Sequence, residues 1–202
     1  MLDVSKVLVI SAHTDDAELG CGGAITRLIE TGANVHHAYF SASNNATLKG
    51  ECSRSNKVLG IPGENILAFD YETRRFQEHR QSILDDLITL REEVKPSLIL
   101  APSSSDIHQD HQVIQAESLR AFKTASIWGY EHPWNNLAFT TDVFVALTRE
   151  HINRKIEALS KYKSQRTRSY FNRDFTLALA RTRGLQAGAS YAESFELRRL
   201  LV

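Results

Sequence analysis

The sequence predicts an α/β fold, a single Rossmann-like domain with a mostly parallel sheet covered by helices on both faces. Short, almost entirely apolar strands alternate along the chain with segments of helical periodicity. These strands lack the apolar–polar alternation of a sheet with one wet face, which indicates burial on both faces. Because no repeat or Pro/Gly/Ser-rich linker interrupts the pattern, we expect one domain over residues 1–202.

The clearest elements lie in the first half of the chain. KVLVISA, ELGCGGAITRLIETG and ANVHHAYF predict a strand, a helix and a strand. Gly20, Gly22 and Gly23 fall inside that helix, where each costs up to about 1 kcal/mol relative to alanine, so they indicate close backbone packing. Further helices are expected near 51–60 and over 77–94, and further strands at ILAFD and SLILAP. SIWGYE and DVFVAL predict later strands, HINRKIEALSKY a helix, and the tail is expected to be rich in helix.

Composition narrows the class of partner. Lysine plus arginine equals aspartate plus glutamate, 24 each, so the chain lacks the basic surplus of a nucleic-acid binder, and a small-molecule substrate is expected. No apolar run reaches the roughly 18 to 20 residues that span a bilayer, and the start resembles no secretory signal. Cys21 and Cys52 form no CxxC pair or disulfide framework. We therefore expect a cytoplasmic protein with no membrane partner, and the sequence is compatible with a homo-oligomer.

Two polar loops follow predicted strands. His13-Thr14-Asp15-Asp16 begins where KVLVISA ends, and Ser103 to His111 begins where SLILAP ends. In a doubly wound sheet the carboxyl ends of the strands border the ligand crevice, so loops far apart in sequence meet there. The rest of the functional interpretation depends on this convergence.

The residues of these loops suit a hydrolytic metal centre. Catalytic zinc keeps three protein ligands and a fourth position for water, and His13, Asp16 and His111 satisfy that count. Asp15 then remains free to accept a proton. His108 is placed to polarise or protonate a reacting group, and Asp110 to orient an imidazole. Taken alone, such an aspartate is most often a helix N-cap and such a histidine a surface residue, but the two clusters together favour the metal.

SAHTDDAELGCGG and DIHQDH resemble the two signature segments of the PIG-L/LmbE-like deacetylases, and weaker similarity extends through YEHPWNN and YAESFE. The resemblance implies a Rossmann-like sheet, a divalent metal, usually zinc, and removal of an acetyl group from an N-acetylated amino sugar. Thr14 stands where many members have proline. By motif position, the resemblance implies His13, Asp16 and His111 as metal ligands, Asp15 as general base, His108 as oxyanion stabiliser or acid, and Asp110 as the partner of His108.

The function we expect is therefore zinc-dependent N-deacetylation of an amino sugar or sugar derivative, sugar nucleotides included, with Fe²⁺ as an alternative metal. Arg75 and Glu131 are the predicted substrate contacts, because guanidinium and carboxylate groups suit sugar hydroxyls or a phosphate. Weaker candidates for the same role are Arg74, Trp134 and Asn135 and, for a nucleotide diphosphate, Arg166, Arg168, Tyr170 and Arg183. Two other classes remain open: a non-haem iron oxygenase, which also uses two histidines and one carboxylate, and a non-catalytic sugar-binding protein.

Overall fold

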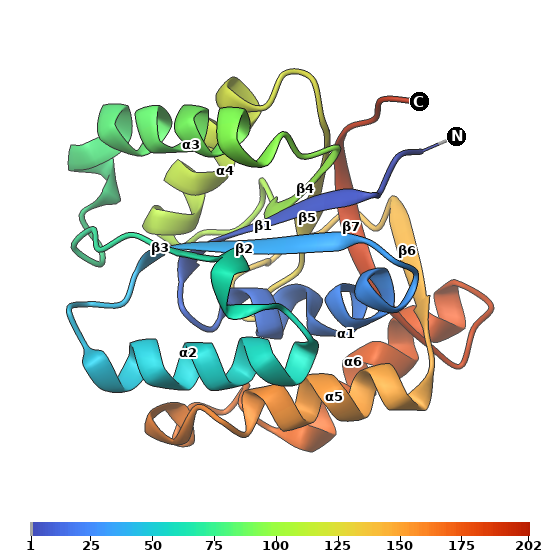
Figure 1. Cartoon of the computed structure of the whole chain (residues 1–202). Coiled ribbons are helices and arrows are strands. Elements are labelled where there is room, and N and C mark those ends of the chain that lie inside the picture. Colours follow the sequence, from blue (N-terminus) through green and yellow to red (C-terminus); the bar gives the residue numbers. More distant parts are fainter. Residues whose placement is uncertain (1) are drawn as a thin grey trace.

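The computed structural model describes residues 2–202, which form one α/β domain around a seven-stranded sheet of order β3-β2-β1-β4-β5-β7-β6 (Figure 1). The first five strands pair in parallel, whereas β7 runs antiparallel to both of its neighbours, so the predicted mostly parallel sheet is confirmed. The strands are β1 (Lys6–His13), β2 (Asn34–Ser41), β3 (Ile66–Ala68), β4 (Leu98–Pro102), β5 (Ser126–Tyr130), β6 (Val143–Leu147) and β7 (Tyr191–Arg199).

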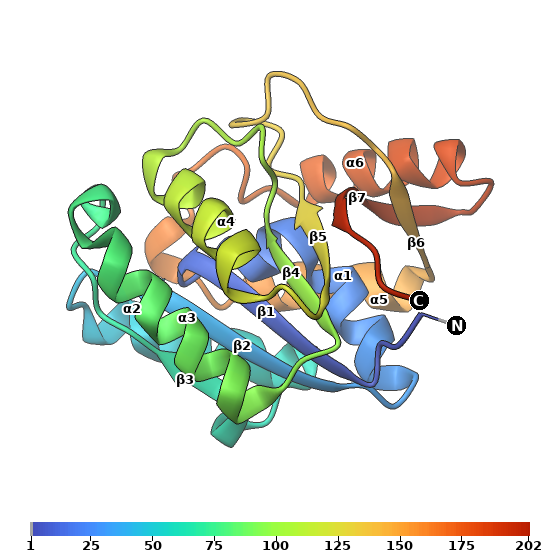
Figure 2. The same cartoon turned by 90° about the horizontal axis from the view of Figure 1, so that it is seen from above.

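Helices cover both faces of this sheet (Figures 1 and 2). One face carries α3 (Arg80–Val94) and α4 (Gln109–Ala121), and the other carries α1 (Asp16–Glu30), α2 (Ala46–Leu59), α5 (Arg149–Leu159) and α6 (Arg173–Gln186). Successive residues of β1 alternate between the two layers: Leu8 and Ile10 join the core under α3 and α4, and Val7 and Val9 join the core under α1. Two-sided burial is why β1 reads as an unbroken apolar run.

Two elements differ from the sequence-based expectation. The stretch Ser103–His111 is not wholly a loop, because α4 begins at Gln109 and carries Asp110 and His111 in its first turn. The tail contributes a strand as well as a helix, and this strand, β7, lies inside the sheet between β5 and β6. Its polar residues Glu193 and Ser194 are buried, which conceals the apolar pattern of a strand.

Helix α1 is broken at Cys21, whose φ and ψ are −143° and 22°. The glycines on either side of the break lie against neighbouring side chains, since a Cβ on Gly20 would come within 2.4 Å of the Tyr130 ring and one on Gly23 within 2.6 Å of Leu147. The predicted close packing at these glycines is confirmed. None of the helices among residues 2–202 combines the length and apolar character that spanning a membrane requires.

Candidate active site

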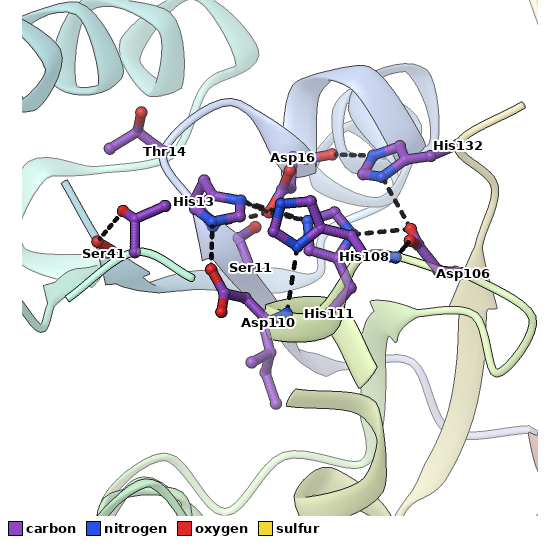
Figure 3. Close-up of polar contacts among 12 residues, drawn as sticks. Ser11, His13, Thr14, Asp16, Ser41, Asp106, His108, Asp110, His111 and His132 are labelled. Atoms are coloured by element: carbon purple, nitrogen blue, oxygen red, sulfur yellow. Dashed lines mark hydrogen bonds and ion pairs between the residues drawn. The ribbon is translucent and has the colours of Figure 1, made fainter. Parts of the chain in front are cut away.

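The two polar loops meet because β1 and β4 are neighbours in the sheet, with Val9 beside Leu100. The chain returns on one side of β1 through β2 and on the other through β4, so this point is a topological switch, where open α/β sheets bind ligands. His13 is the last residue of β1, and Asp16 is the first residue of α1. Figure 3 shows these side chains and His111 from α4 pointing toward one another.

Three donor atoms form a nearly equilateral triangle. His13 Nδ1 lies 3.5 Å from Asp16 Oδ2, His111 Nε2 lies 3.3 Å from the same oxygen, and the two imidazole nitrogens are 3.3 Å apart. A tetrahedral ion with bonds of about 2.0–2.2 Å holds its ligand atoms about 3.4 Å apart. These residues therefore fit a divalent cation such as zinc, and the cavity of about 240 Å³ in front of them leaves its fourth position accessible.

Each imidazole of the triangle has a buried carboxylate behind it. His13 Nε2 lies 3.0 Å from Asp110 Oδ2, and His111 Nδ1 lies 2.7 Å from Asp106 Oδ2 (Figure 3). Donation of these N–H groups to the carboxylates leaves His13 Nδ1 and His111 Nε2 with lone pairs directed at the triangle, as in other carboxylate–histidine–metal sites. Asp106, which the sequence analysis did not single out, thus has the same relation to His111 as Asp110 has to His13.

The carboxylates make this point of the molecule attractive to positive charge. Burial by itself lowers the pKa of both imidazoles, but Asp16 and Asp110 outweigh it and raise the pKa of His13 to about 9. Asp16 and Asp106 likewise raise the pKa of His111 to about 10. Burial opposes ionisation of Asp16, yet the two histidines hold the pKa of its carboxyl well below the usual range. The negative charge thus favours a second proton on each ring, and a metal ion bound at the triangle would displace these protons and free the lone pairs.

Asp15 lies beside the triangle without joining it. It occupies the N-cap position of α1, as a short acidic residue before a helix often does, but its side chain makes no capping hydrogen bond, so the carboxyl group is not engaged by the helix. Asp16 Oδ2 instead accepts a hydrogen bond of 2.7 Å from the backbone N–H of His13. Asp15 lines the cavity and is 7% exposed, and burial together with the charge of Asp16 raises the pKa of its carboxyl. A buried carboxyl with a raised pKa, facing an open metal position, is suited to take up a proton.

His108 faces the same cavity from the N-cap position of α4. Its Nδ1 accepts a hydrogen bond of 3.2 Å from the backbone N–H of Asp110, which assigns the proton of the neutral ring to Nε2. Burial and the neighbouring His111 and His13 lower the pKa of His108 to about 4. The carboxylate of Asp110 contacts His13, and the hydrogen bond that joins Asp110 to His108 comes from the backbone N–H of Asp110 rather than from its side chain.

Comparison with known proteins places this site in a family. The sequence profile of the PIG-L family, described as GlcNAc-PI de-N-acetylase, matches residues 8–122, which is more than half of the chain and includes both loops. The chain belongs to the PIG-L family. The predicted family membership is thereby confirmed.

Relatives of this PIG-L protein carry deacetylase names. The uncharacterized deacetylase YaiS of Escherichia coli (strain K12) is 31% identical over 167 residues, which cover 78% of this chain and 90% of YaiS. The diacetylchitobiose deacetylase of Thermococcus kodakarensis (strain ATCC BAA-918 / JCM 12380 / KOD1) is 28% identical over 126 residues, which cover 54% of this chain and only 46% of that protein.

Solved structures confirm the fold. The N,N'-diacetylchitobiose deacetylase from Pyrococcus horikoshii superposes with a TM-score of 0.79 at 20% identity, covering 96% of this chain and 84% of that one. GalB, the 4-carboxy-2-hydroxymuconate hydratase from Pseudomonas putida KT2440, gives a TM-score of 0.78 at 21% identity, covering 98% of each chain. The architecture thus occurs in proteins named for two different reactions.

The two predicted substrate contacts of this PIG-L protein lie outside the cavity. Arg75 is 51% exposed and pairs with Glu72 and Glu78 on the surface. Glu131 is buried and paired with Arg183, whose Nε donates to it at 3.0 Å. The residue that does line the cavity from this loop is Arg74, so a substrate role for Arg75 or Glu131 remains a prediction that the geometry does not favour.

Proposed function

We propose that this PIG-L protein is a zinc-dependent hydrolase that removes the acetyl group from an N-acetylated amino sugar or sugar derivative. The observation that carries the proposal is the donor triangle of His13, Asp16 and His111 with the uncapped carboxyl of Asp15 beside it. Family membership and relatives named as deacetylases support the reaction class. A cavity of about 240 Å³ is small among ligand pockets, which range over roughly 300–1,000 Å³, and suits one sugar residue.

Asp15 is the residue that we assign to both proton transfers of the reaction. A divalent cation in the triangle would polarise the acetamide carbonyl and lower the pKa of a water molecule bound with it. The Asp15 carboxylate takes a proton from the water as the new C–O bond forms to the acetyl carbon. The same carboxyl then delivers that proton to the amide nitrogen as the C–N bond breaks, so acetate and the free amine leave and Asp15 is regenerated.

His108 is suited to stabilise the oxygen of the reacting carbonyl. With Nδ1 occupied by the backbone N–H of Asp110, the ring presents an Nε2–H donor. A neutral N–H aimed at the amide oxygen becomes a stronger partner as negative charge develops there. We therefore assign the leaving-group proton to Asp15 and oxyanion stabilisation to His108.

GalB provides a second candidate function, because a hydratase of the same fold also adds water to its substrate. Acetate release separates the candidates. Zinc-loaded enzyme would be incubated with a panel of N-acetyl sugars, and acetate and free amine would be measured together. We expect equimolar products. Oxygen uptake and alkene hydration would be measured in parallel to detect an oxygenase or a hydratase. If zinc-loaded enzyme released no acetate from any sugar of the panel, the proposed deacetylase activity would be refuted.

The roles of the two aspartates provide the matched control. We expect Asp15→Asn to retain zinc, measured by elemental analysis, and to lose at least about 100-fold in kcat, the scale of a removed general base. Asp16→Asn is expected to lose metal and activity together. An Asp15→Asn enzyme with near-native kcat would contradict the assigned base even if deacetylation itself is found.

A further inference from the structure

The cavity in front of the triangle has a cationic wall that the proposed hydrolysis does not use. Arg74 and Arg168 line it from two segments far apart in the sequence, together with the neutral side chains of Thr73, Gln165 and Tyr170. Asp15 and Asp16 are the acidic residues of the same lining, and a divalent cation would balance both of them. The two guanidinium groups are then the charged side chains of the lining that the cation does not balance, whereas Asp106 and Asp110 lie behind the histidines and outside the lining.

These two arginines differ in their pairing from others nearby. Arg75, Arg80 and Arg183 all form ion pairs with carboxylates. Within residues 2–202, neither Arg74 nor Arg168 has a carboxylate oxygen within the 4.0 Å of an ion pair. The charges of Asp15 and Asp16 act on Arg168 only from beyond that distance. Guanidinium groups that face a cavity without an ion-paired carboxylate are suited to bind an anionic ligand, because the guanidinium fork matches carboxylate and phosphate oxygens.

Arg74 is held in place by the metal centre itself. Its φ is +71°, a left-handed conformation that costs a non-glycine residue about 1 kcal/mol or more. Its backbone N–H donates a hydrogen bond of 2.7 Å to Asp110 Oδ2, the oxygen that also faces His13. With its backbone held in this way, Arg74 lines the cavity close to the metal-binding triangle.

Arg168 is supported by a row of aromatic rings. Its guanidinium donates a hydrogen bond of 2.6 Å to the Tyr170 hydroxyl, and Tyr170 stacks on Trp134 with centroids 4.0 Å apart and planes at 8°. Trp134 stacks in turn on His132, whose Nδ1 lies 3.4 Å from Asp106 Oδ2. The row thus connects Arg168 to the carboxylate behind the ligand His111, which fixes the arginine relative to the metal centre.

We propose that Arg74 and Arg168 form an anion subsite, so that the substrate is an acidic N-acetyl sugar bearing a phosphate or carboxylate group. The identity of the ligand as a substrate rests on the proposed deacetylation. Anion binding by the cavity does not depend on the proposed deacetylation, and it can be measured in the absence of any reaction.

The kinetic test compares neutral and acidic substrates. N-acetylglucosamine, its 1-phosphate and 6-phosphate, and an N-acetylated aminouronic acid would be assayed for acetate release. We expect kcat/KM to be about 10- to 100-fold higher for at least one acidic sugar, as for charge-assisted hydrogen bonds. Arg74→Gly, Arg74→Ala and Arg168→Ala are expected to reduce this preference by about 10-fold or more. Arg75→Ala and Arg166→Ala serve as neighbouring controls that keep it.

Binding distinguishes failure of this proposal from failure of the proposed reaction. Titration calorimetry of zinc-loaded Asp15→Asn enzyme would compare a sugar phosphate with the neutral sugar, with and without each arginine substitution. Tight, arginine-dependent binding without any deacetylation would retain the subsite and reject the reaction. Equal affinity for neutral and acidic sugars, or a preference lost in Arg75→Ala but kept in Arg74→Ala and Arg168→Ala, would overturn the subsite.

Discussion

The carboxylates of Asp110 and Asp106 fix the ring tautomers of His13 and His111, so their loss should weaken the proposed metal binding without removing a proposed ligand. We predict that Asp106→Asn and Asp110→Asn each lower zinc affinity by about 10- to 100-fold. The affinity is measured by competition with a chromophoric chelator. Asp85→Asn, a change on the exposed side of α3, is the control and should leave affinity unchanged. Unaltered zinc affinity in Asp106→Asn would contradict the role assigned to Asp106.

A second residue-scale effect concerns His37, which is buried in β2 and is not one of the proposed metal ligands. Its ring contacts Asn56 Oδ1 at 2.9 Å and Ser11 Oγ at 3.0 Å, and burial lowers its pKa to about 4. The unfolded chain, with a pKa near 6.5, binds the proton more readily, so stability falls as pH drops from about 6.5 to about 4.

We predict that protonation of His37 lowers the free energy of unfolding by about 3 kcal/mol as the pH falls from about 6.5 to about 4. His37→Gln should remove most of this component. Denaturant unfolding of both proteins between pH 4 and pH 7.5 measures it. Parallel stability curves for the two proteins would show that His37 does not titrate as stated.

At the scale of residues, the sequence motifs predicted which polar side chains the structure brings together. HTDD and HQDH contain the three donor atoms that the structure brings together. The sequence analysis missed Asp106, because a single acidic residue in a loop belongs to no periodic pattern. Its contact with His111 depends on where α4 begins. The sequence analysis preferred Arg75 to Arg74, whereas Arg74 lines the cavity, because the sequence does not show the left-handed backbone at Arg74.

At the scale of elements, the break in α1 is stabilised by a buried ion pair. Glu193 of β7 accepts hydrogen bonds of 3.0 and 2.7 Å from the backbone N–H groups of Gly23 and Ala24, and Lys155 of α5 donates at 2.8 Å to the carbonyl of Leu19. Lys155 and Glu193 pair at 2.6 Å. Together they satisfy backbone groups that the broken helix leaves without partners.

Removing one charge of this pair should be costly. We predict that Glu193→Gln destabilises the protein by about 3–5 kcal/mol, because Lys155 is left buried beside an uncharged partner. The double variant Lys155→Met/Glu193→Gln should be less destabilised than the single one. Urea unfolding gives the three free energies. A single variant within about 1 kcal/mol of wild type would show that the pair is not needed to hold the break.

This pair also explains why β7 was hard to predict. A strand is recognised by its apolar residues, whereas β7 has the buried polar residues Glu193 and Ser194, which form hydrogen bonds with residues outside β7. The requirement for a carboxylate there arises from the break at Cys21, some 170 positions earlier in the chain. The pattern of residues within β7 does not show this dependence on a distant helix. The glycines around Cys21, however, did indicate a close neighbour.

At the scale of the molecule, the sheet order makes the site. The parallel strands and two-sided helix cover were predictable from apolar runs and periodicity, and β1 beside β4 is the arrangement that the convergence of the loops required. Because His13 and Asp16 adjoin β1 while His111 belongs to α4, a bound cation would connect segments about a hundred residues apart. Metal binding should therefore stabilise the whole fold rather than one loop.

The last prediction follows from this linkage. Zinc at 100 times its dissociation constant should add about 2.7 kcal/mol to the free energy of unfolding, which raises Tm by roughly 5–10 °C in a domain of this size. Thermal unfolding with zinc and with a chelator measures the shift. Asp15→Asn should show the full shift, because Asp15 is not a ligand, and His13→Ala/His111→Ala should show none. An equal zinc-dependent shift in the double variant would locate the stabilising metal elsewhere, and loss of the shift in Asp15→Asn would make Asp15 a ligand.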